Sequence, residues 1–147
     1  MDISEVQLIY RKQLKSSQLK QITSSREVSQ LLRESVYDAN TLELRESFKV
    51  LFTNQANRVL GVMHLSEGGI SETCADVRLI LQAAILSNSS GIIVSHNHPS
   101  GNRHPSTADE SFTRKLKEAV RYFDIRLLDH IILTEESYYS FADEGKL

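Results

Sequence analysis

Two of the five histidines in this 147-residue sequence, His96 and His98, are separated by a single residue. If the strand predicted just before them continues through His98, both imidazoles lie on one side and can reach one cation. Asp109, one turn into the following helix, can approach from the opposite side of the loop. Two nitrogens and a carboxylate oxygen leave one tetrahedral position for water, as in catalytic rather than structural zinc sites. The ligand set therefore predicts zinc-dependent hydrolysis.

A helix cap is the competing interpretation of part of this pattern. Ser106 followed three residues later by Asp109 matches a capping box, although Glu or Gln is the more usual partner there. Capping explains this pair, but it does not explain two histidines at the end of a strand. We expect Ser106 to serve in both ways, with its backbone beginning the helix and its hydroxyl directed toward the metal.

The remaining polar residues near this segment are interpreted as structural. His104 is expected on the surface. His130 is expected to be a buried core histidine, and the alternative is that Asp129 and His130 together orient a zinc ligand. Cys74 is the single cysteine, so an intrachain disulfide and a multi-cysteine zinc site are excluded. We interpret Cys74 as a small packing residue.

Hydrophobic periodicity predicts the elements that position these residues. Apolar residues at helical spacing indicate helices over 26–37, around Val77 to Ala84 and from Ser106 through Phe123. Ser25 is expected to cap the first helix and Ser71 or Thr73 the second. Apolar runs or alternation indicate strands at 46–53, 59–65, 91–94, 126–134 and 138–141, and the first two are expected to form a hairpin. Pro99 and Pro105 exclude a helix through the loop between them.

Composition limits the class of protein. The length and the 40% hydrophobic content fit one globular domain. We divide the chain into a polar segment 1–24, with an edge strand around Val6 to Tyr10, and a metal-binding domain 25–147. The net charge of -2 lacks the positive field that non-specific nucleic-acid binding uses. The first residues do not fit a secretory signal and the apolar runs are too short to span a bilayer, so we expect no membrane partner and a cytoplasmic protein.

The residues around the two histidines resemble the motif of a known family. The spacing of His96, His98, Ser106 and Asp109 resembles the JAB/MPN/JAMM metalloprotease motif. The RadC branch is the closer resemblance, and it extends from about Glu46 to the C-terminus. The residues that carry it are His96-Asn97-His98-Pro99-Ser100-Gly101, Pro105-Ser106 and Leu128-Asp129-His130-Ile131-Ile132.

The resemblance implies a fold and a set of roles. The expected fold is an α/β domain of the deaminase-like layered type, with a curved mixed sheet flanked by helices. His96, His98 and Asp109 would bind Zn2+, and Ser106 would donate a hydrogen bond to the oxyanion. Glu46 matches the family glutamate, which would accept a proton from the zinc-bound water and return it to the leaving amine. Other glutamates compete for this last role, namely Glu43, Glu67 and Glu72.

These roles predict a metallopeptidase or isopeptidase that acts on a peptide or protein substrate. A nucleobase deaminase is excluded because its zinc site needs more cysteines than this chain has. The alternative is a DNA-associated RadC-type module of DNA repair or mobile elements that acts mainly by binding. The segment before Glu46 is too short for the helix-hairpin-helix region of many RadC proteins. A second departure lies at Ala75 to Arg78, where many relatives have Pro-Arg-Glu, and it affects any substrate contact there.

Overall fold

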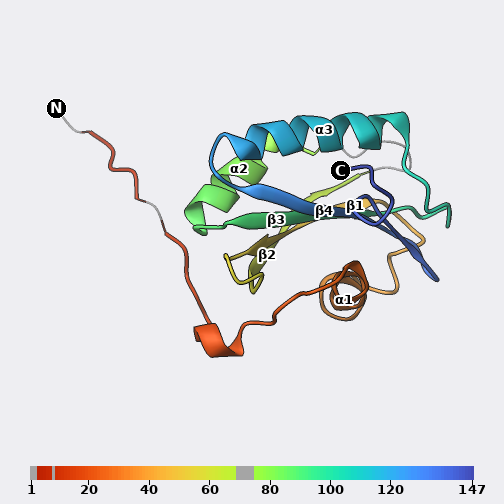
Figure 1. The fold of residues 1–147 in the computed structure, drawn as a ribbon, viewed down its shortest axis with the longest axis horizontal. Coiled ribbons are helices and arrows are strands. Elements are labelled where there is room, and N and C mark those ends of the chain that lie inside the picture. The colour runs from red at the N-terminus through yellow and green to blue at the C-terminus, as the bar shows by residue number, and fades with distance from the viewer. Residues whose placement is uncertain (1–2, 8, 69–74) are drawn as a thin grey trace.

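The computed structural model describes residues 3–7, 9–68 and 75–147, which form a mixed sheet with helices on both faces (Figure 1). The strands are β1 (Ser47–Thr53), β2 (Val59–Glu67), β3 (Gly91–Asn97), β4 (Arg126–Leu133) and β5 (Tyr138–Ser140). Their order across the sheet is β2-β1-β3-β4-β5, and of these neighbours β3 and β4 are parallel while the other pairs are antiparallel. This confirms the predicted α/β fold class and the β1–β2 hairpin.

Helices cover the two faces of the sheet separately (Figure 1). They are η1 (Ser16–Gln18), α1 (Ser25–Leu31), η2 (Leu32–Val36), α2 (Val77–Leu86) and α3 (Thr107–Arg121), where η1 is a 3-10 turn and η2 a π-helix. One core lies under α2 and α3 and contains Ile80, Leu116 and Val120. A second core lies under α1 and η2 and contains Val28 and Leu32. The sheet is therefore the middle of three layers.

The central strand β3 is buried along its whole length. It has neighbours on both edges and helices over both faces, which explains why its sequence is a continuous apolar run rather than an alternating one. Its first residue is Gly91, where a Cβ atom would lie 2.7 Å from the hydroxyl of Thr53 and 2.8 Å from Cδ1 of Leu128. Glycine is needed there because the neighbouring side chains approach the backbone so closely.

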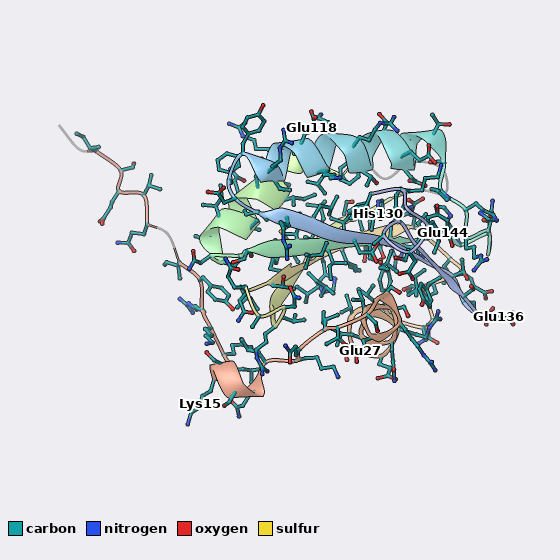
Figure 2. All side chains as sticks on the ribbon, viewed as in Figure 1. Lys15, Glu27, Glu118, His130, Glu136 and Glu144 are labelled. Atoms are coloured by element: carbon teal, nitrogen blue, oxygen red, sulfur yellow. The ribbon has the colours of Figure 1, made fainter. Side chains whose placement is uncertain are left out.

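The layer between α3 and the sheet also contains polar side chains. Figure 2 shows His130 within this layer, whereas Glu118 lies on the outer face of α3. His130 is completely buried, on β4, next to the strand that carries His96. A buried histidine needs partners for its ring nitrogens.

The edge strand predicted around Val6 to Tyr10 is wrong for the residues that the structure describes. Residues 6, 7, 9 and 10 have no strand pairing, and the side chains of Val6 and Ile9 are 87% and 54% exposed. Their apolar side chains bury too little surface to offset the entropy lost on ordering. Among the described residues, the first pairing along the chain is an isolated bridge between Gln21 and Arg58.

Helix starts differ from the prediction by small shifts. The side chain of Ser24, rather than Ser25, accepts the N–H of Glu27 and caps α1. The cap of α2 is Asp76, which accepts the N–H of Arg78. The alternatives Ser71 and Thr73, like Cys74, lie outside the described residues.

The end of α3 also differs from the prediction. The helical spacing predicts a helix through Phe123, but α3 ends at Arg121 and Phe123 is 52% exposed. Asp124 then takes a left-handed conformation with φ of 55°, which turns the chain toward β4. The helix therefore ends before Phe123, so helical spacing no longer places this side chain against the core.

Candidate metal centre

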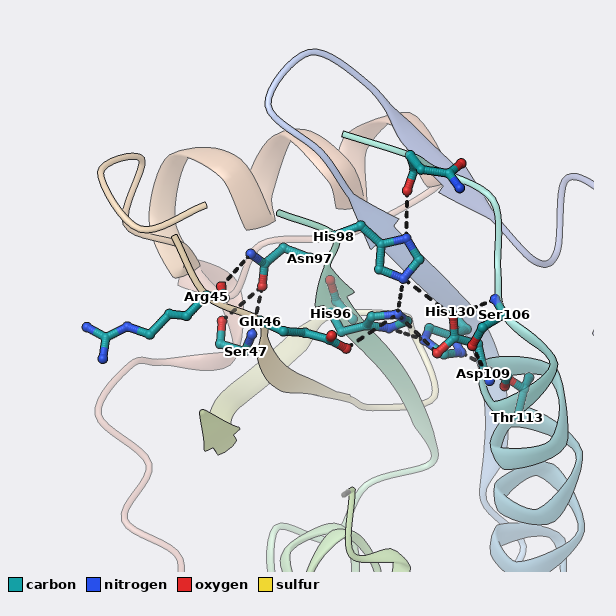
Figure 3. A network of polar contacts seen from close by, with 12 residues as sticks. Arg45, Glu46, Ser47, His96, Asn97, His98, Ser106, Asp109, Thr113 and His130 are labelled. Atoms are coloured by element: carbon teal, nitrogen blue, oxygen red, sulfur yellow. Dashed lines mark hydrogen bonds and ion pairs between the residues drawn. The ribbon is translucent and has the colours of Figure 1, made fainter. Parts of the chain in front are cut away.

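Three side chains meet where β3 and α3 approach each other (Figure 3). His96 lies in β3 with its side chain fully buried, His98 follows the strand directly, and Asp109 lies in the first turn of α3. Nε2 of His96 is 2.9 Å from Nε2 of His98. The carboxylate oxygens of Asp109 lie 3.3 Å from Nε2 of His96 and 3.4 Å from Nε2 of His98. The sequence-predicted ligand set is thus brought together.

The spacing of these atoms fits a metal ion. Donor atoms bound tetrahedrally to one zinc at about 2.0–2.1 Å lie roughly 3.3 Å from one another. The observed separations of 2.9, 3.3 and 3.4 Å bracket that value. Two imidazole nitrogens and a carboxylate are also ligands that Zn2+ accepts readily. His96, His98 and Asp109 could therefore hold a divalent cation together.

The sheet register explains why the two imidazoles face the same way. Side chains alternate along a strand, and His98 extends the alternation beyond β3 because its N–H donates to the carbonyl of Leu133 on β4. Asn97 points to the opposite face, where it is buried. Its amide donates to the carbonyls of Leu42 and Arg45 and accepts the N–H of Ser47.

Glu46 reaches the cluster from the neighbouring strand. In the β1–β3 register Phe48 lies opposite His96, and Glu46 precedes Phe48 by two residues on the same face. Its Oε1 lies 4.0 Å from Nε2 of His96, and its side chain is 14% exposed. A carboxylate is thus placed beside the three donor atoms without being one of them.

The competing glutamates do not share this position. Glu67 pairs with Arg45 at 3.5 Å, and its side chain is 60% exposed. Glu43 lies beside Glu135, whose pKa it raises. Glu72 lies outside the described residues. Among the described candidates, Glu46 is the one next to the histidines.

Ser106 and Asp109 form the capping box that the sequence suggested as an alternative. The hydroxyl oxygen of Ser106 accepts the N–H of Asp109 at 3.1 Å, and Oδ2 of Asp109 accepts the N–H of Ser106 at 2.8 Å. Asp109 therefore caps α3 and faces both histidines at the same time. The two interpretations do not exclude each other.

The electrostatics of the cluster favour a bound cation. Burial alone would raise the pKa of Asp109, but hydrogen bonds with His96 and His98 outweigh it and hold the pKa well below its ordinary value. Burial likewise would lower the pKa of His98, yet its contacts with Asp109 and the carbonyl of Asn102 raise it. The carboxylate stays ionised and attracts positive charge to the histidines, from either a proton or a metal.

His130 makes a contact that our preferred interpretation missed. Its Nε2 lies 2.8 Å from Nδ1 of His96, and its Nδ1 lies 2.7 Å from the hydroxyl of Thr113. The alternative role for His130, beside a ligand, is therefore the one that the contacts support. Asp129 takes no part in orienting His96, because its carboxylate accepts hydrogen bonds from Ser140 and backbone N–H groups instead. His104 is exposed, as predicted.

A model of the RadC-like JAB domain matches residues 22–146. The chain belongs to the RadC-like JAB family. The mixed sheet with its flanking helices is consistent with a JAB/MPN domain.

Curated relatives of this RadC-like domain carry only a general name, UPF0758 protein. One from Flavobacterium johnsoniae is 42% identical over 127 residues, covering 86% of this chain and 54% of the relative. One from Porphyromonas gingivalis is 44% identical over 104 residues, covering 70% and 46%. UPF0758 protein YfjY of Escherichia coli K12 is 40% identical over 103 residues, covering 70% and 64%.

The RadC-like chain spans about half the length of the first two of these relatives. Their names state no activity, substrate or partner. Within the described residues, no helix combines the length and the apolar character needed to cross a membrane. Function must therefore be argued from the site itself.

Proposed function

We propose that this RadC-like domain hydrolyses an amide or isopeptide bond in a peptide or protein substrate, with Zn2+ held by His96, His98 and Asp109. The single observation that carries the proposal is the position of Glu46, a partly buried carboxylate 4.0 Å from Nε2 of His96. Metal-assisted hydrolysis of an amide needs a base beside the metal that does not itself occupy the ligand set. Glu46 meets that requirement.

Each residue has a distinct task in this proposal. Zinc held by these three residues would supply a Lewis acid and would lower the pKa of water at the site to about 7. Glu46 takes up the proton that the attacking water loses and returns it to the leaving amine. The same carboxylate thus acts first as a base and then as an acid.

Ser106 would stabilise negative charge. Its oxygen accepts the N–H of Asp109, so the hydroxyl proton remains free to be donated. We assign that proton to the oxyanion that develops on the substrate carbonyl. Loss of one such donor in acyl-transfer enzymes typically costs about 10²–10³ in kcat.

A phenylalanine ring restricts access to the cluster from within. Phe48 stacks on His96 with ring centroids 5.6 Å apart and an interplanar angle of 4°. Because His96 is fully buried and Phe48 is 4% exposed, solvent and substrate approach from the side of His98 and Glu46. The charged groups therefore operate against an apolar wall, which strengthens their interactions.

Two measurements test this proposal in sequence. Metal analysis of purified protein should show about one zinc per chain, and His96→Ala should lose it. A screen of peptides and lysine-linked isopeptides should then show cleavage that Glu46→Gln abolishes while zinc content is unchanged. Glu67→Gln is the matched control, because Glu67 is exposed and paired with Arg45. The proposal is overturned if the wild type holds no stoichiometric zinc, or if Glu46→Gln cleaves as fast as the control.

A DNA-binding assay tests the alternative function. If duplex or single-stranded DNA binds with micromolar affinity and His98→Ala leaves that binding unchanged, a binding module is the better description. The net charge of -2 argues against that result. If the protein contacts DNA phosphates, its affinity for DNA should fall as the salt concentration rises.

A further inference from the structure

We infer that His130 and Thr113 are positioning residues, which together fix the proton of His96 on Nδ1 and leave its Nε2 free to bind a metal. The inference rests on the proposed metal site and adds two residues to it. It concerns the buried side of the cluster, where neither residue touches the substrate or the metal.

The contacts form a continuous chain between two of the ligand residues (Figure 3). It begins at Nδ1 of His96, which lies 2.8 Å from Nε2 of His130. Nδ1 of His130 lies 2.7 Å from the hydroxyl oxygen of Thr113. That hydroxyl donates to the backbone carbonyl of Asp109, also at 2.7 Å. The chain therefore starts at one ligand residue and ends at the backbone of another.

The direction of every hydrogen bond in this chain follows from its last member. A carbonyl oxygen can only accept, so the single hydroxyl proton of Thr113 is committed to Asp109. The oxygen of Thr113 must then accept from Nδ1–H of His130. A neutral imidazole with its proton on Nδ1 has a lone pair on Nε2, which accepts from Nδ1–H of His96. The lone pair of His96 is consequently on Nε2, facing the metal position.

The surroundings of His130 keep it in the neutral form that this argument requires. His130 is 0% exposed, and its ring nitrogens contact His96 and Thr113, neither of which carries a negative charge that would favour a protonated ring. Phe141 stacks on its ring with centroids 4.5 Å apart and an interplanar angle of 8°. Thr113 is 2% exposed, so water does not compete readily for its hydroxyl.

His98 obtains the same tautomer by a different route. Its Nδ1 lies 2.6 Å from the carbonyl of Asn102, which can only accept, so Nδ1 carries the proton. Nε2 of neutral His98 is then also a lone pair. Two lone pairs and a carboxylate face one another over 2.9–3.4 Å with no proton assigned between them. In this neutral form the arrangement needs positive charge at its centre, which a proton or a metal ion can supply.

The first test reads the tautomers directly in metal-free protein. Long-range ¹H–¹⁵N spectra at about pH 8.5, roughly two units above the ordinary histidine pKa, distinguish Nδ1–H from Nε2–H for each ring. We expect Nδ1–H for both His96 and His130 in the wild type. Thr113→Val removes the acceptor and should give mixed tautomers at both rings, whereas Thr113→Ser should restore the wild-type spectrum.

The second test measures zinc affinity by competition with a chelator. Loss of a residue that orients a ligand typically weakens metal binding about 10- to 100-fold. We expect that loss in Thr113→Val and its recovery in Thr113→Ser. Thr53→Val is the control for removing a buried hydroxyl, because Thr53 is 0% exposed and its hydroxyl has no hydrogen-bond partner within the described residues. Its zinc affinity should equal that of the wild type.

The outcomes separate this inference from the proposed function. Nε2–H at His96 in the wild type, or unchanged tautomers and affinity in Thr113→Val, would overturn the positioning role. A wild type that binds no zinc but shows the expected tautomers would overturn the proposed function alone. Co2+ spectra of the loaded Thr113→Val protein should also differ from wild type, which a purely structural role of the hydroxyl would not produce.

Discussion

The carboxylate oxygen Oδ2 of Asp109 accepts the backbone N–H of Ser106 at 2.8 Å and faces Nε2 of His98 at 3.4 Å. One atom thus closes the N-terminus of α3 and presents a negative charge to the candidate metal centre. The position of Asp109 is set by where the helix begins rather than by the loop before it. Substitutions that remove either the charge of Asp109 or the hydrogen bond of the cap can separate metal binding from helix capping.

Asp109→Asn should lose metal while keeping most of the helix cap. The amide oxygen of asparagine can still accept the N–H of Ser106, but its charge and its ligand strength are gone. We expect zinc content to fall to a small fraction of the wild-type value. Metal-free protein should lose stability at neutral pH, because the ionised carboxylate that His96 and His98 stabilise is also gone. Zinc analysis measures the metal content, and urea unfolding measures the stability of the metal-free protein. Full zinc retention would contradict the assignment of Asp109 as a ligand.

Ser106→Ala should have the opposite effect. Removing the hydroxyl that accepts the N–H of Asp109 costs about 1 kcal/mol of unfolding free energy, within the usual range for a cap. Zinc content should stay near that of the wild type. The exposed Ser111 on the same helix is the control, and Ser111→Ala should change stability by less than about 0.5 kcal/mol. Equal stabilities for the two variants would show that the cap is unimportant.

Asn97→Ala should be strongly destabilising and should disturb the position of Glu46. The buried amide of Asn97 bonds the carbonyl of Arg45 and the N–H of Ser47, the two neighbours of Glu46. Each buried backbone group left without a partner costs about 1–3 kcal/mol, so a loss of about 3 kcal/mol or more is expected.

The exposed Asn40 provides the comparison for Asn97. Asn40→Ala removes a surface amide and should lower the unfolding free energy by less than about 0.5 kcal/mol. Denaturant unfolding of both variants in the absence of metal isolates the scaffold effect. A loss below about 1 kcal/mol in Asn97→Ala would mean that water replaces its hydrogen bonds.

Gly91→Ala should destabilise the central strand. The added methyl group would lie 2.7 Å from the hydroxyl of Thr53 and 2.8 Å from Cδ1 of Leu128, so both side chains must move. Overpacking of this kind costs about 1–3 kcal/mol. Gly61 on β2 is the matched glycine, because a Cβ there meets nothing within 4 Å. Thermal unfolding should place Gly61→Ala close to the wild type, and a similar midpoint for Gly91→Ala would contradict this account.

Local periodicity was enough to predict much of this domain. The pairing of β1 with β2 and the common face of His96 and His98 follow from alternation within a strand. The position of Asp109 follows from its distance to a helix start. These features depend on neighbours in sequence, where the physical rules are strongest.

The contact between His96 and His130 could not be derived in the same way. It depends on the parallel register of β3 and β4, in which Val94 lies opposite His130, and the two strands are connected through α3. One signal was present in the sequence. Asp109 and Thr113 are four residues apart, so they share a helical face, and Thr113 lies in phase with the apolar stripe. A threonine directed into a core needs a polar partner.

The predicted N-terminal strand failed for a related reason. Scattered apolar residues around Val6 suggest a strand, but a strand forms only where a partner edge and a core accept it. In the structure Val6 stays 87% exposed. Pattern alone therefore overestimates strands in segments that have nothing to pack against.

The two histidines differ in what holds their Nδ1 atoms: His96 is tied to buried side chains, and His98 to the carbonyl of Asn102 in an exposed loop. The buried core therefore fixes the orientation of His96, whereas a surface loop fixes that of His98. Substitutions in the loop 99–105 can shift the second imidazole without disturbing the sheet. An engineer who wished to change the ion preference of the proposed metal centre would begin in that loop.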